Sequence, residues 1–145
     1  MDQDVQKLID GLNEDLANEY GAAIQYTYSA AVVSGLYRSA LKPFFEDEIN
    51  DEMGHALYLS EKIKTLGGTP TTQSAKVAQP TEVKDLLEAA LEAEKDTIKR
   101  YETRKQQAEK VGFTELVVKL EDMIADETGH KEEIERLLSD PRIHS

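Results

Sequence analysis

Four long segments of the chain carry apolar residues at steps of three and four, and a glutamate interrupts each apolar stripe near its middle. Such steps predict amphipathic α-helices that each bury one face, and strand-like alternation is absent. The segments span residues 4–34, 41–66, 81–110 and 114–139. The interrupting residues are Glu19, Glu52, Glu94 and Glu127. A fold that buries these stripes must also accommodate their carboxylates.

The breaks between the segments predict how the helices are connected. Gly35 and Pro43 bracket a short first connection, and Gly112 marks a shorter third one, so these neighbours should be antiparallel. The middle connection, residues 67–80, has the composition of a loop and could extend roughly 45 Å, the length of a helix. Such a crossover makes the second and third helices parallel. We therefore predict a single all-α domain over residues 1–145, a ferritin-like antiparallel four-helix bundle.

Two of the glutamates are followed by histidine three residues later, which places each pair side by side on a helix. The spacings also repeat. Within each predicted hairpin the two glutamates are 33 residues apart, and every group of the first hairpin recurs 75 residues later. Two equivalent hairpins related by a pseudo-two-fold axis would bring six side chains to the bundle centre. They are Glu19, Glu52, His55, Glu94, Glu127 and His130.

This set of side chains predicts a di-iron or di-manganese carboxylate centre. No Lys or Arg is expected near the carboxylates on the stripes, and an unpaired buried charge costs several kcal/mol. Two divalent cations would offset four carboxylates, and carboxylate with imidazole suits iron or manganese. Asp51 and Asp126 could each accept the free N–H of a histidine ligand across the bundle.

Three segments resemble bacterioferritin: Glu19-Tyr20-Gly21-Ala22-Ala23-Ile24-Gln25-Tyr26, Asp51-Glu52-Met53-x-His55-Ala56 and Asp126-Glu127-x-Gly129-His130. The similarity spans residues 5–138. It implies that the six residues above are metal ligands, with Glu52 and Glu127 bridging two irons. It also implies ferroxidase activity, in which dioxygen or peroxide oxidises Fe(II) and ferric mineral is stored in an oligomeric shell. By the same resemblance, Tyr26 lies beside the di-iron centre, and Met53 ligates a b-type haem shared across a two-fold dimer interface.

Some of these residues have a second interpretation. Tyr26 and Tyr101, which follow Glu19 and Glu94 by seven residues, can simply pack with a satisfied hydroxyl. Met53 is equally suited to fill an interface as an apolar side chain. His144 is predicted to have no function.

Gly54 and Gly129 occupy equivalent positions inside the two Glu-x-x-His motifs. Each costs a helix about 1 kcal/mol relative to alanine. Close approach of a helix or cofactor would explain them, and so would coincidence.

Two departures from bacterioferritin affect the prediction. Only 15 residues follow His130, and Asp140-Pro141 ends the last helix, so we expect no fifth helix. A dimer-based shell of 12 subunits is then favoured over one of 24, with a plain dimer as the alternative. The symmetric pair Tyr26 and Tyr101 is similar to a tyrosine pair in rubrerythrin, although Thr97 occupies the position where rubrerythrin has a further glutamate. The alternative function is therefore rubrerythrin-like or manganese-catalase-like removal of peroxide without storage.

Composition argues against several other classes. The 145 residues include 29 acidic and 17 basic side chains, a net charge of −12, which disfavours a nucleic-acid partner and hence a DNA-coating shell. The chain has no cysteine, so thiolate sites are excluded. No apolar run approaches the ~20 residues of a membrane span, and Met1-Asp2-Gln3-Asp4 does not resemble a secretory signal. A cytoplasmic protein without membrane contact is expected.

Overall fold

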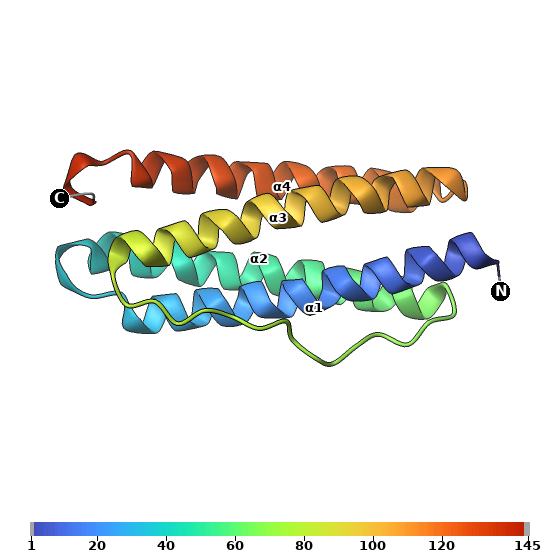
Figure 1. Ribbon diagram of the computed structural model, residues 1–145, viewed down its shortest axis with the longest axis horizontal. Helices are drawn as coiled ribbons and strands as arrows, with labels where there is room; N and C mark the ends of the chain where they lie inside the picture. Colours follow the sequence, from blue (N-terminus) through green and yellow to red (C-terminus); the bar gives the residue numbers. More distant parts are fainter. Residues whose placement is uncertain (1, 144–145) are drawn as a thin grey trace.

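The computed structural model describes residues 2–143, which form a bundle of four long helices (Figure 1). The elements are α1 (Gln3–Val32), η1 (Gly35–Tyr37), α2 (Arg38–Thr65), α3 (Val83–Lys110), α4 (Thr114–Leu138) and η2 (Pro141–Ile143), where η denotes a 3-10 helix. No strand occurs among the described residues, so the all-α prediction is confirmed. His144 lies outside the described residues.

The connections follow the predicted topology. In Figure 1, α1 and α2 form one antiparallel hairpin, α3 and α4 form another, and the crossover runs back along α1 so that α2 and α3 are parallel. Backbone and side chain both hold the crossover on α1. The Ala75 N–H donates to the Ala17 carbonyl at 2.9 Å, and Asn13 bonds the backbone of Thr69 at 3.1 Å and of Thr71 at 2.8 Å.

The first connection is shorter than predicted. It occupies residues 33–37, and α2 already begins at Arg38, which leaves Pro43 in the second helical turn. The Arg38 guanidinium donates to the carbonyls of Val33 at 2.6 Å and Ala30 at 3.2 Å. These bonds satisfy carbonyl groups at the end of α1. The second helix can therefore begin at Arg38, five residues before Pro43.

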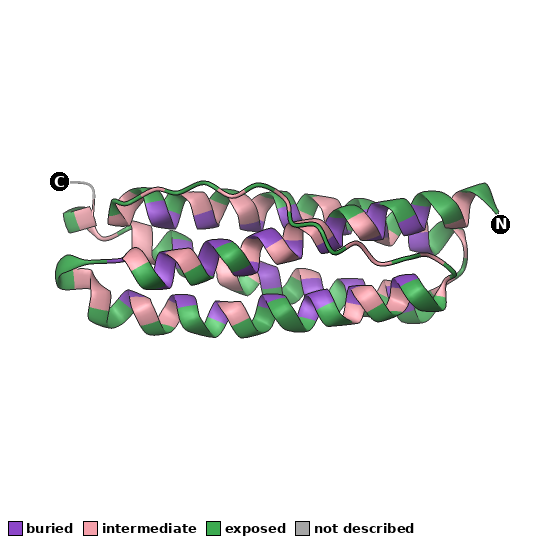
Figure 2. Ribbon diagram, turned by 90° about the horizontal axis from the view of Figure 1, so that it is seen from below, coloured by how far each residue is buried: buried purple, intermediate pink, exposed green. Residues whose placement is uncertain are grey.

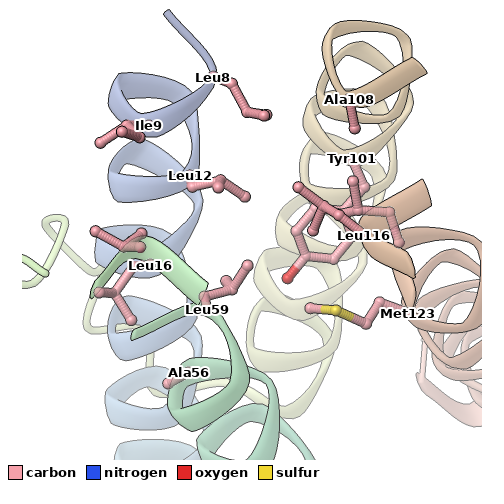
Figure 3. Close-up of a cluster of buried hydrophobic side chains, with 12 residues drawn as sticks. Leu8, Ile9, Leu12, Leu16, Ala56, Leu59, Tyr101, Ala108, Leu116 and Met123 are labelled. Carbon is pink, nitrogen blue, oxygen red and sulfur yellow. The ribbon is translucent and has the colours of Figure 1, made fainter. Parts of the chain in front are cut away.

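The apolar core is divided into two clusters along the bundle, and Figure 2 shows buried residues along all four helices. One cluster includes Leu12, Leu16, Leu59, Leu120 and Met123, some of which are drawn in Figure 3. The other includes Val33, Phe45, Leu86, Leu87 and Ile134. Between these apolar clusters the helices bury acidic and histidine side chains.

No helix in residues 2–143 combines the length and apolar character needed to cross a membrane.

Candidate metal centre

The six predicted side chains converge in the middle of the bundle. Four carboxylates are almost fully buried there: Glu19 and Glu94 come from α1 and α3, and Glu52 and Glu127 come from α2 and α4. His55 and His130 lie one turn beyond Glu52 and Glu127, as their spacing predicts. Apolar residues before and after each glutamate lie on the same face of the helix. Burial of this apolar face also buries the glutamate.

The ligand atoms form two groupings, within each of which all lie less than 4.8 Å apart. We call the first the His55 position; it comprises Glu19, Glu52, His55 and Glu127. We call the second the His130 position; it comprises Glu48, Glu52, Glu94 and His130. Glu52 belongs to both, and Glu127 Oε1 lies 3.3 Å from His55 Nδ1 and 3.6 Å from His130 Nδ1. Glu52 and Glu127 are therefore central to the arrangement.

Each histidine is oriented by an aspartate from the opposite hairpin. His55 Nε2 lies 3.1 Å from Asp126 Oδ2, and His130 Nε2 lies 3.1 Å from Asp51 Oδ2. The aspartates are more than half exposed, whereas Nδ1 of each histidine faces the buried carboxylates. A carboxylate at Nε2 favours the tautomer with its proton on that nitrogen, which leaves Nδ1 free to bind a cation.

Two buried tyrosines orient the outer carboxylates. The Tyr26 hydroxyl donates to Glu94 Oε1 at 2.7 Å, and the Tyr101 hydroxyl donates to Glu19 Oε1. Tyr101 belongs to one apolar cluster and Tyr26 to the other, and the hydroxyl of each bonds a central carboxylate. Burial, followed by the nearby carboxylates, raises the pKa of both phenols well above 10, so both remain hydrogen-bond donors.

Many polar atoms of the centre lack hydrogen-bond partners. They include both carboxylate oxygens of Glu52 and of Glu127, one oxygen each of Glu19, Glu48 and Glu94, and Nδ1 of both histidines. A buried polar group without a partner costs about 1–3 kcal/mol, and more when charged. Oxygen and imidazole nitrogen atoms that face one another in this way are the ligands that iron and manganese prefer. The residues therefore fit a pair of such ions.

The pKa shifts reflect the crowding of acids. Burial and the neighbouring carboxylates raise the pKa of Glu52 and Glu127 well above 4.5. Burial also acts to raise the pKa of Glu94, but its close contacts with Glu127 and His130 and the hydrogen bond from Tyr26 lower it overall. Without cations, protons must therefore neutralise part of this layer, and binding of cations would displace them.

Burial alone would lower the pKa of both histidines, but the adjacent carboxylates outweigh it. Contacts with Glu19 are the main opposing influence on His55, and its pKa rises to about 9. Contacts with Glu48, Glu52 and Glu94 raise the pKa of His130 still further. Both imidazoles are thus protonated at neutral pH when no metal is bound.

Sequence reasoning missed Glu48. Glu48 is 6% exposed, whereas the adjacent Ile49 is only half-buried. The signal is present in the sequence, because Phe45, Glu48 and Glu52 follow helical steps of three and four.

One basic side chain is buried on α3, ten residues after Glu94. Arg104 is 5% exposed and binds the buried Asp15 carboxylate through two bonds of 2.8 and 3.1 Å. Gly11 leaves the space for its guanidinium, since a Cβ there would collide with it. Arg104 is paired with Asp15, one turn before Glu19, so it does not neutralise the central carboxylates.

Met53 lies apart from the centre, on the outer surface of α2. It is 46% exposed, as is Ile24 of α1, and both line an open groove of about 400 Å³. Tyr20, Ala23 and Ile49 contribute further apolar surface to this groove. An accessible thioether in an apolar groove fits an axial ligand of haem, and it equally fits contact with another subunit.

Comparison with known proteins places this geometry in context. Residues 9–143 match the ferritin-like domain family. A ferritin-like diiron-carboxylate protein from Bacillus anthracis str. Ames has 65% identity and a TM-score of 0.95; the match covers 96% of this chain and all of that one.

Bacterioferritins are more distant and somewhat longer relatives. The Rhodobacter capsulatus bacterioferritin is 32% identical over 138 residues, which cover 92% of this chain and 83% of that protein. A structure of it, with a metal-free dinuclear site and a heme iron, superposes with a TM-score of 0.84 at 26% identity, covering 92% and 84% of the two chains. The Desulfovibrio desulfuricans bacterioferritin, a diiron protein, superposes with a TM-score of 0.88 at 28% identity, covering 97% and 86%.

Proposed function

The chain belongs to the ferritin-like domain family, and on this premise we propose that it is a bacterioferritin-like ferroxidase. In this proposal it oxidises Fe(II) with dioxygen or peroxide at a dinuclear centre and stores the ferric product. The observation that carries the proposal is the layer of buried carboxylates and imidazoles whose ligand atoms lack partners. Hydrogen bonds within the chain leave these atoms unsatisfied, whereas two cations would satisfy them.

The proposed ligands are the six residues predicted from the sequence. Glu19 and His55 would hold one ion, Glu94 and His130 the other, and Glu52 and Glu127 would bridge them. Iron is the favoured metal and manganese the alternative. The bound iron pair would supply the electrons that reduce the oxidant.

The surrounding residues of the chain prepare the centre for this chemistry. The Tyr26 hydroxyl holds one oxygen of Glu94, and the Tyr101 hydroxyl holds one oxygen of Glu19. The second oxygen of each glutamate would then be available to bind a metal ion. Asp51 and Asp126 fix the histidine rings. Glu52 and Glu127, with raised pKa values, would release protons when cations bind.

Ferrous ions would reach the centre through its exposed side. The side chains of Asp51 and Asp126 are 54% and 60% exposed and contact His130 and His55, so they connect solvent with the proposed metal positions. The net charge of −12 would raise the local concentration of cations at such a surface.

Storage requires assembly, and the exposed groove around Met53 is the proposed contact between two copies. Two facing grooves would supply one methionine each to a shared b-type haem. A 12-subunit shell built from such dimers is the favoured assembly. Native mass together with a visible spectrum tests both points. A 12-subunit mass with a Soret band that Met53→Ala abolishes would support them, whereas a dimer without haem absorbance would contradict both.

The activity itself is tested by Glu94→Ala. We expect rapid Fe(II) oxidation, followed by ferric absorbance, to be lost while far-ultraviolet circular dichroism stays helical. Glu92→Ala, an exposed glutamate on the same helix, is the matched control and should retain the wild-type rate. Equal rates for Glu94→Ala and wild type would refute the site assignment.

Iron stoichiometry separates storage from simple peroxide removal. A storage protein should retain many irons per chain as ferric mineral after repeated additions of Fe(II) and oxidant. Uptake that stops at two irons per chain, together with fast peroxide consumption, would favour a rubrerythrin-like peroxidase or manganese-catalase-like enzyme instead.

A further inference from the structure

Glu48 is an acidic side chain of the centre that the six-ligand scheme does not use. It lies on α2 one turn before Glu52 and is 6% exposed. Its Oε2 atom lies 2.7 Å from His130 Nδ1, yet neither atom makes a hydrogen bond of suitable geometry. In the metal-free chain the two atoms form an ion pair when His130 is protonated, and a cation that displaces this proton would contact both of them.

That partner would occupy the His130 position. The ligand atoms of Glu48, Glu52, Glu94 and His130 all lie within 4.8 Å of one another. Glu94 Oε2 and Glu52 Oε1 also lack partners and lie 3.8 and 3.6 Å from His130 Nδ1. One cation among these atoms would satisfy them together.

The His55 position has no equivalent of Glu48. The residue 75 positions after Glu48 is Met123, whose side chain is 2% exposed and belongs to an apolar cluster. A thioether is a poor ligand for the hard cations that carboxylates prefer. The pseudo-two-fold symmetry of the centre is therefore broken at one ligand.

We propose that Glu48 is an additional carboxylate ligand of the His130 position. This position therefore has the higher affinity for a metal ion and is occupied first. The inference rests on the proposed dinuclear centre and adds an order of loading to it. Glu52 belongs to both positions, and Glu127 Oε1 lies 3.3 Å from His55 Nδ1 and 3.6 Å from His130 Nδ1, so both glutamates are within reach of either ion. With these two shared, the His130 position has one carboxylate more than the His55 position. Glu48 supplies another anionic oxygen in a buried setting, where attraction to a cation is weakly screened.

The consequence for the whole centre is an excess of negative charge. The buried carboxylates are Glu19, Glu48, Glu52, Glu94 and Glu127, a formal −5 when all are ionised. Two divalent cations would leave one negative charge, and the excess lies on the side of His130. The two ions should therefore bind with unequal affinities.

Calorimetric titration of the full chain with Co²⁺ tests the proposal. We expect the wild type to bind two ions in steps whose dissociation constants differ at least 10-fold. Glu48→Met, which installs the residue found at the symmetric position, should weaken the tighter step by about 10–100-fold. Glu46→Met is the matched control, an exposed glutamate on the same helix, and should leave both steps unchanged. Glu48→Gln retains the shape of the side chain and tests the charge alone if the methionine variant does not fold.

Histidine variants identify the position involved. In His55→Ala the remaining site should be tight and should weaken on adding Glu48→Met. In His130→Ala the remaining site should be weak and should not respond to Glu48→Met. Two equal steps in the wild type, unchanged by Glu48→Met, would overturn the role of Glu48 and leave the dinuclear centre intact. Absence of any Co²⁺ binding would overturn both.

Discussion

The α1–α2 hairpin and the α3–α4 hairpin present the same chemical groups at positions 75 residues apart. Glutamate, aspartate, histidine and tyrosine each recur in this way. The contacts, however, run between hairpins: His55 meets Asp126, His130 meets Asp51, and Tyr26 and Tyr101 reach the glutamate of the opposite half. Neither hairpin can orient its own ligands, so the centre exists only when the two halves are packed together.

The differences between the hairpins lie around this symmetric set. Glu48 corresponds to Met123, which makes the metal positions unequal. Asp15 and Arg104 correspond to Ala90 and Ser29. The buried Asp15 carboxylate pairs with Arg104 and, at 3.7 Å, with Arg100, so these charges join α1 to α3 on one side of the centre only. The repeated residues include the six ligands proposed from the sequence, and the unrepeated ones, Glu48 among them, make the two sides differ.

Breaking the unrepeated ion pair should have the largest effect. Arg104→Met removes both hydrogen bonds from the buried Asp15 carboxylate and leaves only Arg100, whose Nε lies 3.7 Å from Asp15 Oδ1, as a counter-charge. We expect this loss to lower the free energy of unfolding by about 3–4 kcal/mol. Chemical denaturation of the metal-free chain measures this loss.

The double variant Asp15→Ala/Arg104→Met controls for charge. Burial raises the pKa of Asp15 even beside Arg104, so the pair is incompletely compensated for its desolvation. Removal of both charges should therefore recover most of the lost stability. If the double variant is as unstable as Arg104→Met, the loss of stability comes from lost packing around the guanidinium and not from the unpaired charge.

The two histidines should differ in how they couple stability to pH. The pKa of His55 is about 9 in the folded, metal-free chain and about 6.5 when unfolded. Its stabilising contribution is complete below pH 6.5 and is lost as the pH rises through 9, a change of about 2–3 kcal/mol. Denaturation of the metal-free chain at several pH values measures this slope.

Substitution of each histidine sharpens the comparison. His55→Gln should reduce the slope between pH 6.5 and 9. His130→Gln should reduce the slope over the same range and should reduce it more at and above pH 9, because the pKa of His130 is raised further and it stays protonated when folded. Equal slopes for both variants would contradict the proposed difference between the two sides.

The paired tyrosines should be similar in effect. Tyr26→Phe and Tyr101→Phe each deprive one buried carboxylate oxygen of its donor, at a cost of about 1–2 kcal/mol in the free energy of unfolding. Thermal unfolding of both variants measures it. A loss confined to Tyr101→Phe would show that only one of the two contacts contributes to stability.

The repeat explains why so much of the centre was predictable. A helix places residues three apart together, and the recurrence of Glu52–His55 as Glu127–His130 requires equivalent surroundings. Residues outside the repeat lacked this support. Glu48 has methionine, not glutamate, at the equivalent position 75 residues later, and the position of Arg104 depends on Asp15 and Gly11, which lie far from it in sequence. Contacts between distant helices of this kind leave no local pattern.

The smallest predicted effect concerns Gly54 and Gly129, which occupy equivalent exposed sites within the two motifs. A Cβ at either position would meet nothing within 4 Å, so this chain itself does not require glycine there. Gly129→Ala should therefore stabilise the subunit by about 0.5–1 kcal/mol, measured by denaturation. Gly54 adjoins Met53 and the proposed partner groove. If a second copy packs closely on α2, Gly54→Ala should stabilise an isolated subunit equally but lower the fraction assembled in native mass measurements. Equal behaviour of both variants in the assembled protein would place the contact between subunits elsewhere.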